Sequence, residues 1–180
     1  MKKLMTVLAA VTAVLCSLPA ASTAGQLDRL AASVSRCHTS ELAVSLGRSG
    51  VGLGNVGVNV YLRNRSPNTC FVFGYVGFGL RDRHHRRQRS RVQWGNTYFQ
   101  IDPRPHRVVL RSGARAVTNL AWTANPLPGE PQQGPCEPPS SWLEVTPPDE
   151  RAYRLARFGM VVCGHGGLFS TALTTKRPRP

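Results

Sequence analysis

The segment 56–80, with the sequence VGVNVYLRNRSPNTCFVFGYVGFGL, restricts the possible folds of this chain more than any other part. Its first half alternates apolar side chains with small or polar ones, the apolar positions being Val56, Val58, Val60 and Leu62. A period of two residues is typical of a β-strand with one buried face. Turn-forming residues occupy 64–69, and a β-branched and aromatic run begins at Cys70. We therefore predict two strands joined as a hairpin.

Short apolar or alternating runs elsewhere predict further strands. They lie at 41–46, 92–94, 98–101, 108–110, 116–122, 142–145, 153–162 and 168–173. Almost no stretch sustains the 3.6-residue period of an amphipathic helix. Many short strands without helices indicate an all-β domain, which we place at residues 37–173 as two antiparallel sheets packed face to face.

Three segments are predicted to connect these strands. The glycine-rich segment 47–57 indicates a loop or a loose hairpin. Segment 125–139 contains six prolines, which cannot donate a ladder of hydrogen bonds, so we predict a long loop that Cys136 ties down. Segment 81–91 has no apolar face at either period and is most simply a solvated loop between strands.

The N-terminus has the three parts of a secretory signal peptide. A basic start is followed by an apolar run over 4–18 and by small residues before Gly25, so we expect residues 1–24 to be removed. A permanent membrane anchor is disfavoured because Ser17 and Pro19 interrupt the apolar run. Lipid attachment at Cys16 is disfavoured because a bulky leucine precedes it. The expected location is secreted or associated with the cell envelope.

Both ends of the mature domain are predicted to carry short extensions. Residues 25–36 form an N-terminal linker, with one or two helical turns as the alternative. Residues 174–180 are rich in proline and basic side chains, and they are predicted to be a disordered tail.

Four cysteines remain after removal of the signal peptide. They are Cys37, Cys70, Cys136 and Cys163. An even number in an exported chain indicates two disulfides, although four cysteines permit three pairings and the sequence alone does not choose among them. A zinc site would need closely spaced ligands, and only Cys163 and His165 come near that spacing. We expect no metal site and no cofactor.

Arginine makes the chain strongly basic. The net charge is +14, or +12 once Lys2 and Lys3 are removed. One segment holds the candidate anion-binding residues Arg81, Arg83, Arg86, Arg87, Arg89 and Arg91. Guanidinium groups bind phosphate and carboxylate through paired hydrogen bonds. An anionic envelope polymer, lipid head groups or an acidic protein surface are the expected partners, unless the segment is merely solvated. Nucleic acid is less expected because no aromatic side chains are interleaved.

No catalytic motif is found in the sequence. No G-x-S-x-G segment presents a serine at a sharp turn. The nine carboxylates are scattered and mostly adjacent to arginine, which disfavours a glycosidase pair. We expect a non-enzymatic monomer. The alternative is a hydrolase-type enzyme whose site is assembled from loops around His84, His85 or His106.

The order of the cysteines and several short motifs allow a comparison with known families. The motifs are Cys37, Leu-Arg-Asn at 62–64, Cys70, Gly-Tyr-Val-Gly-Phe at 74–78, Val-Leu-Arg-Ser-Gly-Ala-Arg-Ala at 109–116 and Leu-Glu-Val-Thr-Pro-Pro at 143–148, with Cys136 and Cys163 in the expected places. Over residues 37–172 the chain resembles the secreted actinobacterial family catalogued only as domain of unknown function 4232. Val76 and Ser112 stand where that family usually has proline.

The resemblance implies a fold and a location, but no known activity. It implies an exported, immunoglobulin-like antiparallel β-sandwich with two local disulfides. The implied pairs are Cys37 with Cys70 and Cys136 with Cys163.

Overall fold

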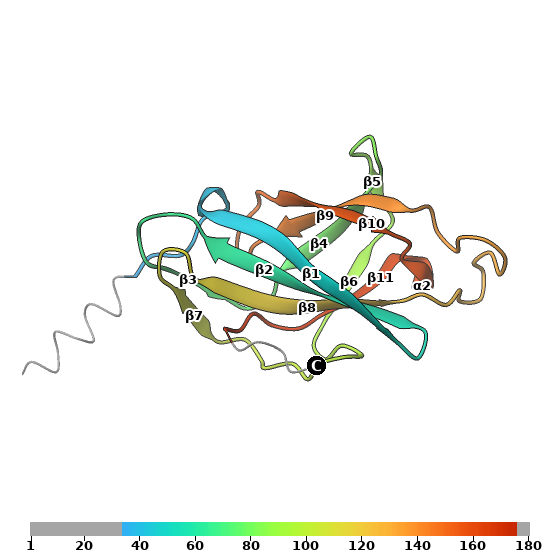
Figure 1. Cartoon of the computed structure of the whole chain (residues 1–180), viewed down its shortest axis with the longest axis horizontal. Helices are drawn as coiled ribbons and strands as arrows, with labels where there is room; N and C mark the ends of the chain where they lie inside the picture. The colour runs from blue at the N-terminus through green and yellow to red at the C-terminus, as the bar shows by residue number, and fades with distance from the viewer. Residues whose placement is uncertain (1–33, 176–180) are drawn as a thin grey trace, which may run out of the picture. The chain divides into compact units, whose positions relative to one another are not determined.

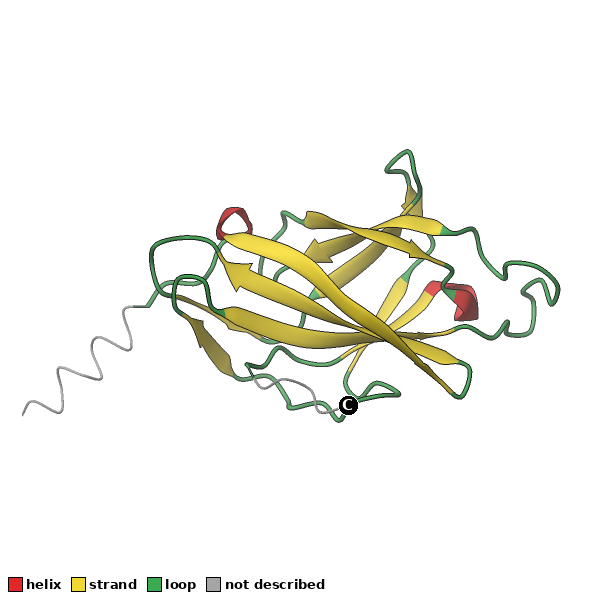
Figure 2. Cartoon of the chain, in the orientation of Figure 1, coloured by secondary structure: helices red, strands yellow, loops and turns green. Residues whose placement is uncertain are grey.

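The computed structural model describes residues 34–175 (Figure 1). The predicted signal peptide, the linker up to residue 33 and residues 176–180 of the predicted tail lie outside this part. The strands are β1 (Leu42–Gly52), β2 (Asn55–Asn64), β3 (Cys70–Phe73), β4 (Gly77–Arg81), β5 (Arg87–Gln88), β6 (Arg91–Trp94), β7 (Arg107–Leu110), β8 (Arg115–Thr123), β9 (Ser140–Thr146), β10 (Arg154–Met160) and β11 (Gly167–Ser170). Two single turns of helix, η1 (Thr39–Glu41) and α2 (Cys163–Gly166), complete the elements, and the domain is all-β as predicted (Figure 2).

Hydrogen bonds join the strands into three sheets. The larger sheet has the order β1-β2-β8-β11-β6, the second has β10-β9-β4-β5, and β3 and β7 form a separate pair. The ladders are antiparallel except for β6 and β11, which run parallel. The prediction of antiparallel sheets is therefore confirmed, with one parallel pair and one small additional sheet that the sequence did not indicate. The arrangement fits an immunoglobulin-like sandwich.

The hydrophobic core contains apolar side chains from all three sheets. In β2 the alternating residues predicted to be buried, from Val56 to Leu62, belong to this core, which confirms the two-residue period. Trp122 of β8 meets Phe158 of β10 edge to face, with ring centroids 5.2 Å apart, and so joins the larger sheet to the second one. The indole N–H of Trp122 donates to the carbonyl of Val161, so this buried ring leaves no polar atom unpaired.

The predicted hairpin between 56–63 and the strand that begins at Cys70 is wrong. Strand β2 lies between β1 and β8, whereas β3 pairs with β7 in a different sheet. Asn64 explains the change of sheet, because its side-chain oxygen accepts the N–H of Ser66 and its amide donates to the carbonyls of Asn68 and Leu110. These bonds turn the chain out of the larger sheet, and both edges of β2 are already paired.

The first hairpin of the domain is instead formed by β1 and β2. Their ladder extends almost to the connecting residues Leu53 and Gly54, so the glycine-rich segment is mostly strand. Both connecting residues have positive φ, 49° for Leu53 and 75° for Gly54. This is the backbone of a two-residue turn whose twist suits a hairpin, and glycine adopts it without a steric penalty.

The predicted strand at 98–101 is also wrong, because these residues form an irregular loop. The hydroxyl of Thr97 accepts the N–H groups of Phe99 and Gln100, which folds the backbone locally. The ring of Phe99 then covers Gly57 of β2, where an added Cβ would lie only 2.5 Å from a ring carbon. Glycine at position 57 therefore makes this close approach possible.

Both disulfides have the pairing that the family resemblance implied. Cys37 is bonded to Cys70 at the start of β3, and Cys136 of the proline-rich loop is bonded to Cys163 of α2. The long loop at 125–139 is confirmed and is fixed near its C-terminal end, as predicted. No helix within residues 34–175 is long and apolar enough to span a membrane.

Candidate functional site

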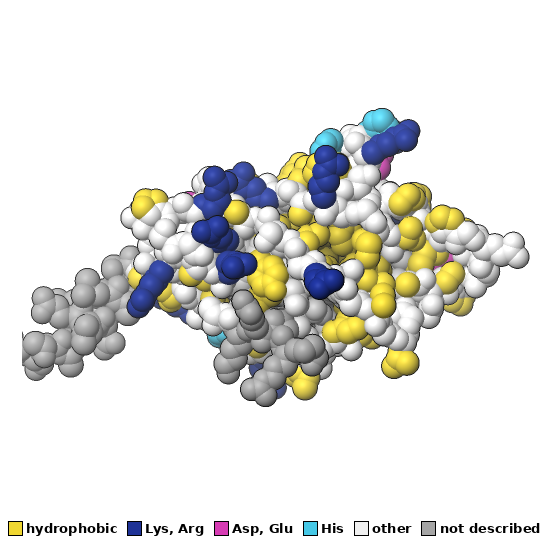
Figure 3. Space-filling view, viewed as in Figure 1, with side chains coloured by type: hydrophobic (Ala, Val, Ile, Leu, Met, Phe, Trp, Pro, Cys, Tyr) yellow, Lys and Arg dark blue, Asp and Glu magenta, His cyan; other side chains and the backbone are white. Residues whose placement is uncertain are grey.

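The basic segment 81–91 is mostly exposed turn and loop, as predicted, but the short strand Arg87–Gln88 pairs with the end of β4 and closes it into a hairpin. Arg81 ends β4 and pairs with Arg87 of β5, and Leu80 pairs with Gln88. The remaining end of the segment, Arg91, begins β6 in the larger sheet. The hairpin stands out from the second sheet, with basic side chains and histidines at its tip (Figures 1 and 3).

Asp82 fixes the turn of this hairpin. One carboxylate oxygen accepts the N–H groups of His84 and Arg86 at 2.8 and 2.9 Å, and the other accepts Nε of Arg86 at 2.7 Å. Burial opposes ionisation of Asp82, but the hydrogen bonds from Arg86 and His84 outweigh it and hold the pKa of Asp82 below its usual value. The turn therefore depends on a carboxylate that the sequence analysis did not single out.

Arg81 is committed to a structural ion pair. Its guanidinium donates to Glu144 of β9 with a distance of 2.7 Å from Nε to the carboxylate oxygen. Both side chains are only 12% exposed. The guanidinium of Arg81 also lies over the ring of Tyr153, 4.8 Å from its centroid. Because these contacts engage its guanidinium group, Arg81 is not free to bind an external anion.

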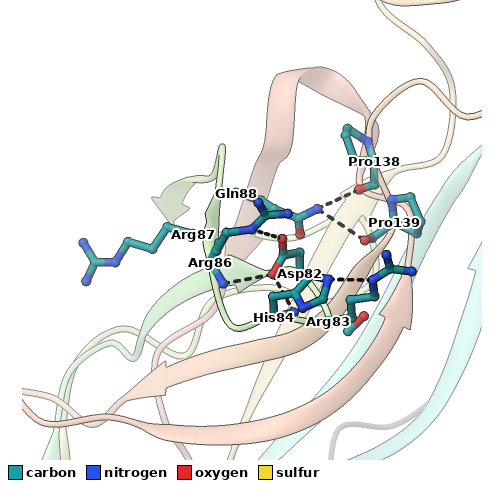
Figure 4. A pocket seen from close by; sticks show the side chains of 9 residues that line it. Asp82, Arg83, His84, Arg86, Arg87, Gln88, Pro138 and Pro139 are labelled. Atoms are coloured by element: carbon teal, nitrogen blue, oxygen red, sulfur yellow. Dashed lines mark hydrogen bonds and ion pairs between the residues drawn. The ribbon is translucent and has the colours of Figure 1, made fainter.

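A hollow of about 640 Å³ lies between the hairpin and the end of the proline-rich loop (Figure 4). Its lining residues are Asp82, Arg83, His84, Arg86, Arg87, Gln88, Pro138, Pro139 and Ser141. The amide of Gln88 donates to the carbonyls of Pro138 and Pro139, both at 3.2 Å, and so attaches the loop to the hairpin. This connection forms one wall of the hollow.

The structure separates the six predicted arginines into different environments. Arg83, Arg86 and Arg87 border the hollow, and Figure 4 shows the side chain of Arg87 extending away from the two prolines. Arg86 pairs with Asp82, while Arg87 is 76% exposed and lies 3.6 Å from Glu144. Arg89 borders a smaller adjoining hollow of about 140 Å³.

The cations still outnumber the acids around the hairpin. Asp82 and Glu144 are the carboxylates that pair with its arginines in the described part of the chain. Among the residues that the structure describes, Arg83 bonds only to the ring of His84, which carries no negative charge. The hairpin therefore presents an excess of positive charge to solvent, and Arg83 is its cation without a carboxylate partner.

The three histidines of the enzyme alternative do not converge. His84 borders the hollow, His85 stacks on Trp142 with ring centroids 5.0 Å apart, and the ring of His106 bonds to the carbonyl of Arg104. All three are exposed. Within residues 34–175, none of their rings is bonded to a carboxylate or a hydroxyl group.

A second polar cluster lies where the proline-rich loop meets α2. The buried carboxylate of Glu130 accepts backbone N–H groups from Leu127 at 2.6 Å, Gly164 at 3.0 Å and His165 at 2.6 Å. Burial opposes ionisation, but these three donors outweigh it and hold the pKa of Glu130 below its usual value. Glu137 and the ring of His165 lie beside this carboxylate. Of this cluster, sequence reasoning singled out His165 alone, and it missed Glu130 because that residue stands among prolines without a recognisable motif.

The fold and the hairpin define a disulfide-bonded, all-β domain with a basic surface site. The chain belongs to the family described as "Domain of unknown function (DUF4232)", whose model matches residues 37–171. This confirms the family resemblance, while the export and the actinobacterial origin expected with it stay predictions. No curated protein and no solved structure matches the chain.

Proposed function

We propose that the chain is a non-enzymatic, exported binding module that holds anionic groups of an envelope or extracellular polymer at the β4–β5 hairpin. The observation that carries this proposal is the open hollow lined by Arg83 and Arg86. Guanidinium groups in such a place form paired hydrogen bonds with phosphate or carboxylate groups. The two disulfides support export, because disulfides persist in oxidising compartments.

A polymer suits the arrangement of the cations better than a single small anion. Arg83, Arg86 and Arg87 line the hollow, and Arg89 borders the adjoining hollow. One small ligand does not reach all of these groups at once, whereas a chain of spaced charges does. Lipid head groups and an acidic protein surface are therefore the less favoured partners.

A triple substitution tests the site. We expect Arg83→Ser, Arg86→Ser and Arg87→Ser together to weaken binding to inorganic polyphosphate or polygalacturonate by about tenfold or more in low salt. The slope of log affinity against log salt should also flatten, because fewer counterions are released. Titration over a series of salt concentrations measures both quantities, and circular dichroism checks that the fold is retained.

A matched control separates a specific site from general charge. Arg48→Ser, Arg65→Ser and Arg111→Ser remove the same charge from exposed positions outside the hollow. If both triple variants lose affinity equally, net charge alone explains binding and the proposed site is wrong. Stronger binding to phosphatidylglycerol vesicles than to either polymer would show that lipid head groups are the partner instead.

A further inference from the structure

The cluster of Glu130, Glu137 and His165 has the composition of a metal site. One ligand atom from each side chain lies within 4.8 Å of the other two. Carboxylate oxygens and an imidazole nitrogen are donors that Zn²⁺ and related divalent transition metals accept. We propose that this cluster binds one divalent transition-metal ion such as Zn²⁺, independently of the anion site.

The Glu130 carboxylate keeps one acceptor position free on Oε1. A carboxylate has about four lone-pair positions. The N–H groups of Leu127 and Gly164 occupy Oε2, and the N–H of His165 occupies only one position on Oε1. Oε1 lies 3.8 Å from Nδ1 of His165, and the Glu130 side chain is 2% exposed. A cation bound here would compensate a buried negative charge that water does not reach.

The Glu137 carboxylate supplies the second oxygen donor. Within residues 34–175 it has no ion pair and no hydrogen-bond partner, so binding a metal would break no existing contact. A side chain without a partner can also rotate to close the remaining distance, since zinc bonds to oxygen and nitrogen are about 2.0–2.2 Å long.

The neighbouring disulfide holds the ligand-bearing segments together before any ion binds. Glu137 directly follows Cys136, and His165 lies two residues after Cys163, its bonded partner. Cross-linked segments lose less conformational entropy when a ligand joins them. The proposal departs from the expectation of no metal site, which considered only the spacing of Cys163 and His165. The sulfur of Cys163 lies in the disulfide and is not one of the proposed ligands.

The donor set also indicates which ions are excluded. Calcium and magnesium take oxygen ligands, and the imidazole of His165 is a poor donor for either ion. Three protein ligands leave the fourth position of a tetrahedral zinc site open to water or to an external group. We therefore expect selectivity for Zn²⁺ over Ca²⁺ and Mg²⁺.

Calorimetric titration of the disulfide-bonded, tag-free chain with zinc chloride tests the site. We expect one ion per chain, and we expect Glu137→Gln and His165→Asn each to raise the dissociation constant at least about tenfold. Asparagine suits position 165 because its φ is 55°, which asparagine tolerates. In nuclear magnetic resonance spectra, the amide signals of Gly164 and His165 should shift when zinc is added.

His85→Asn is the matched control, because His85 has the same left-handed backbone with φ of 62° and lies outside the cluster. This variant should bind zinc like the unmodified protein. The proposal is overturned if the unmodified chain shows no saturable binding. It is equally overturned if His85→Asn weakens binding as much as His165→Asn does, because the ion would then bind at the β4–β5 hairpin.

Discussion

Asp102 holds the loop at 95–106 in place through hydrogen bonds to Tyr75 and to Ala172. The Tyr75 hydroxyl donates to one Asp102 oxygen at 2.7 Å, and the other oxygen accepts the N–H of Ala172 at 2.6 Å. The hydrogen bond to Asp102, burial and the Asp102 charge together raise the pKa of Tyr75 to about 12. Two segments far apart in the sequence thus meet at one carboxylate.

This contact predicts a loss of stability in alkaline solution. The pKa of Tyr75 is higher in the folded state than its usual value of 10.0. The stability that the Tyr75 hydroxyl gives to the fold is therefore fully present below pH 10 and is lost as the pH rises through about 12. An ultraviolet titration of tyrosinate should show a late step that Tyr75→Phe removes. Tyr98→Phe, at an exposed position, is the control and should leave that step in place. A late step that survives Tyr75→Phe would contradict the assignment.

At the scale of elements, the loop at 95–106 and the larger sheet depend on each other through Phe99 and Gly57. Gly57→Ala places a Cβ within 2.5 Å of the Phe99 ring, so we expect a loss of about 1–3 kcal/mol in the free energy of unfolding. In a Phe99→Ala background the same substitution should cost little, since the obstructing ring is absent. Urea unfolding of the unmodified chain, the two single variants and the double variant completes a double-mutant cycle and measures the coupling between positions 57 and 99.

Gly50→Ala is the control for this cycle. Gly50 lies opposite Gly57 in the ladder of β1 and β2, and an added Cβ there meets nothing within 4 Å. Its effect on stability should therefore be the same with and without Phe99. A cost of Gly57→Ala that persists in full after removal of the ring would show that the backbone at position 57, and not the ring, is the cause.

Strands could be predicted from local patterns, but their partners could not. The alternation from Val56 to Leu62 reports which face of β2 is buried, because burial on one face imposes a two-residue period. It does not report which strands lie on either side. The chain leaves the larger sheet because of bonds made by Asn64, one of them to Leu110 in a distant strand, and no local pattern records such a bond.

The candidate anion site was likewise only partly predictable from local sequence patterns. The arginines were visible in the sequence, and their guanidinium chemistry predicted an anion partner. Their availability depends on distant residues, since Glu144 occupies Arg81 and the carbonyls of Pro138 and Pro139 complete the wall of the hollow. The position of each arginine in the fold therefore determines whether its guanidinium group is free to bind an anion.

At the scale of the whole molecule, the two disulfides restrain different parts of the domain. Their cysteines are 33 and 27 residues apart in the sequence. Closing loops of this size stabilises a fold by about 3–4 kcal/mol each in the chain-entropy model. We expect paired alanine substitutions at Cys37 and Cys70, or at Cys136 and Cys163, to lower the free energy of unfolding by amounts of this order.

Urea unfolding of both variants, compared with the unmodified chain under oxidising and reducing conditions, measures these contributions. Reducing agent should lower the stability of each variant further, because one bridge remains in each. If either paired variant unfolds at the same urea concentration as the unmodified chain, the corresponding disulfide does not restrain the unfolded state as we expect.

The parallel pairing of β6 with β11 sets an order of events during biosynthesis. In the described part of the chain, β6 is an edge strand whose sheet neighbour is β11 alone, and residues 95–166 separate these two strands in the sequence. A chain that emerges N-terminus first can close the hairpin of β1 and β2 at once. It cannot seat β6 until residues 167–170 have appeared. The basic hairpin just before β6 therefore remains joined to an unattached strand until synthesis is nearly complete.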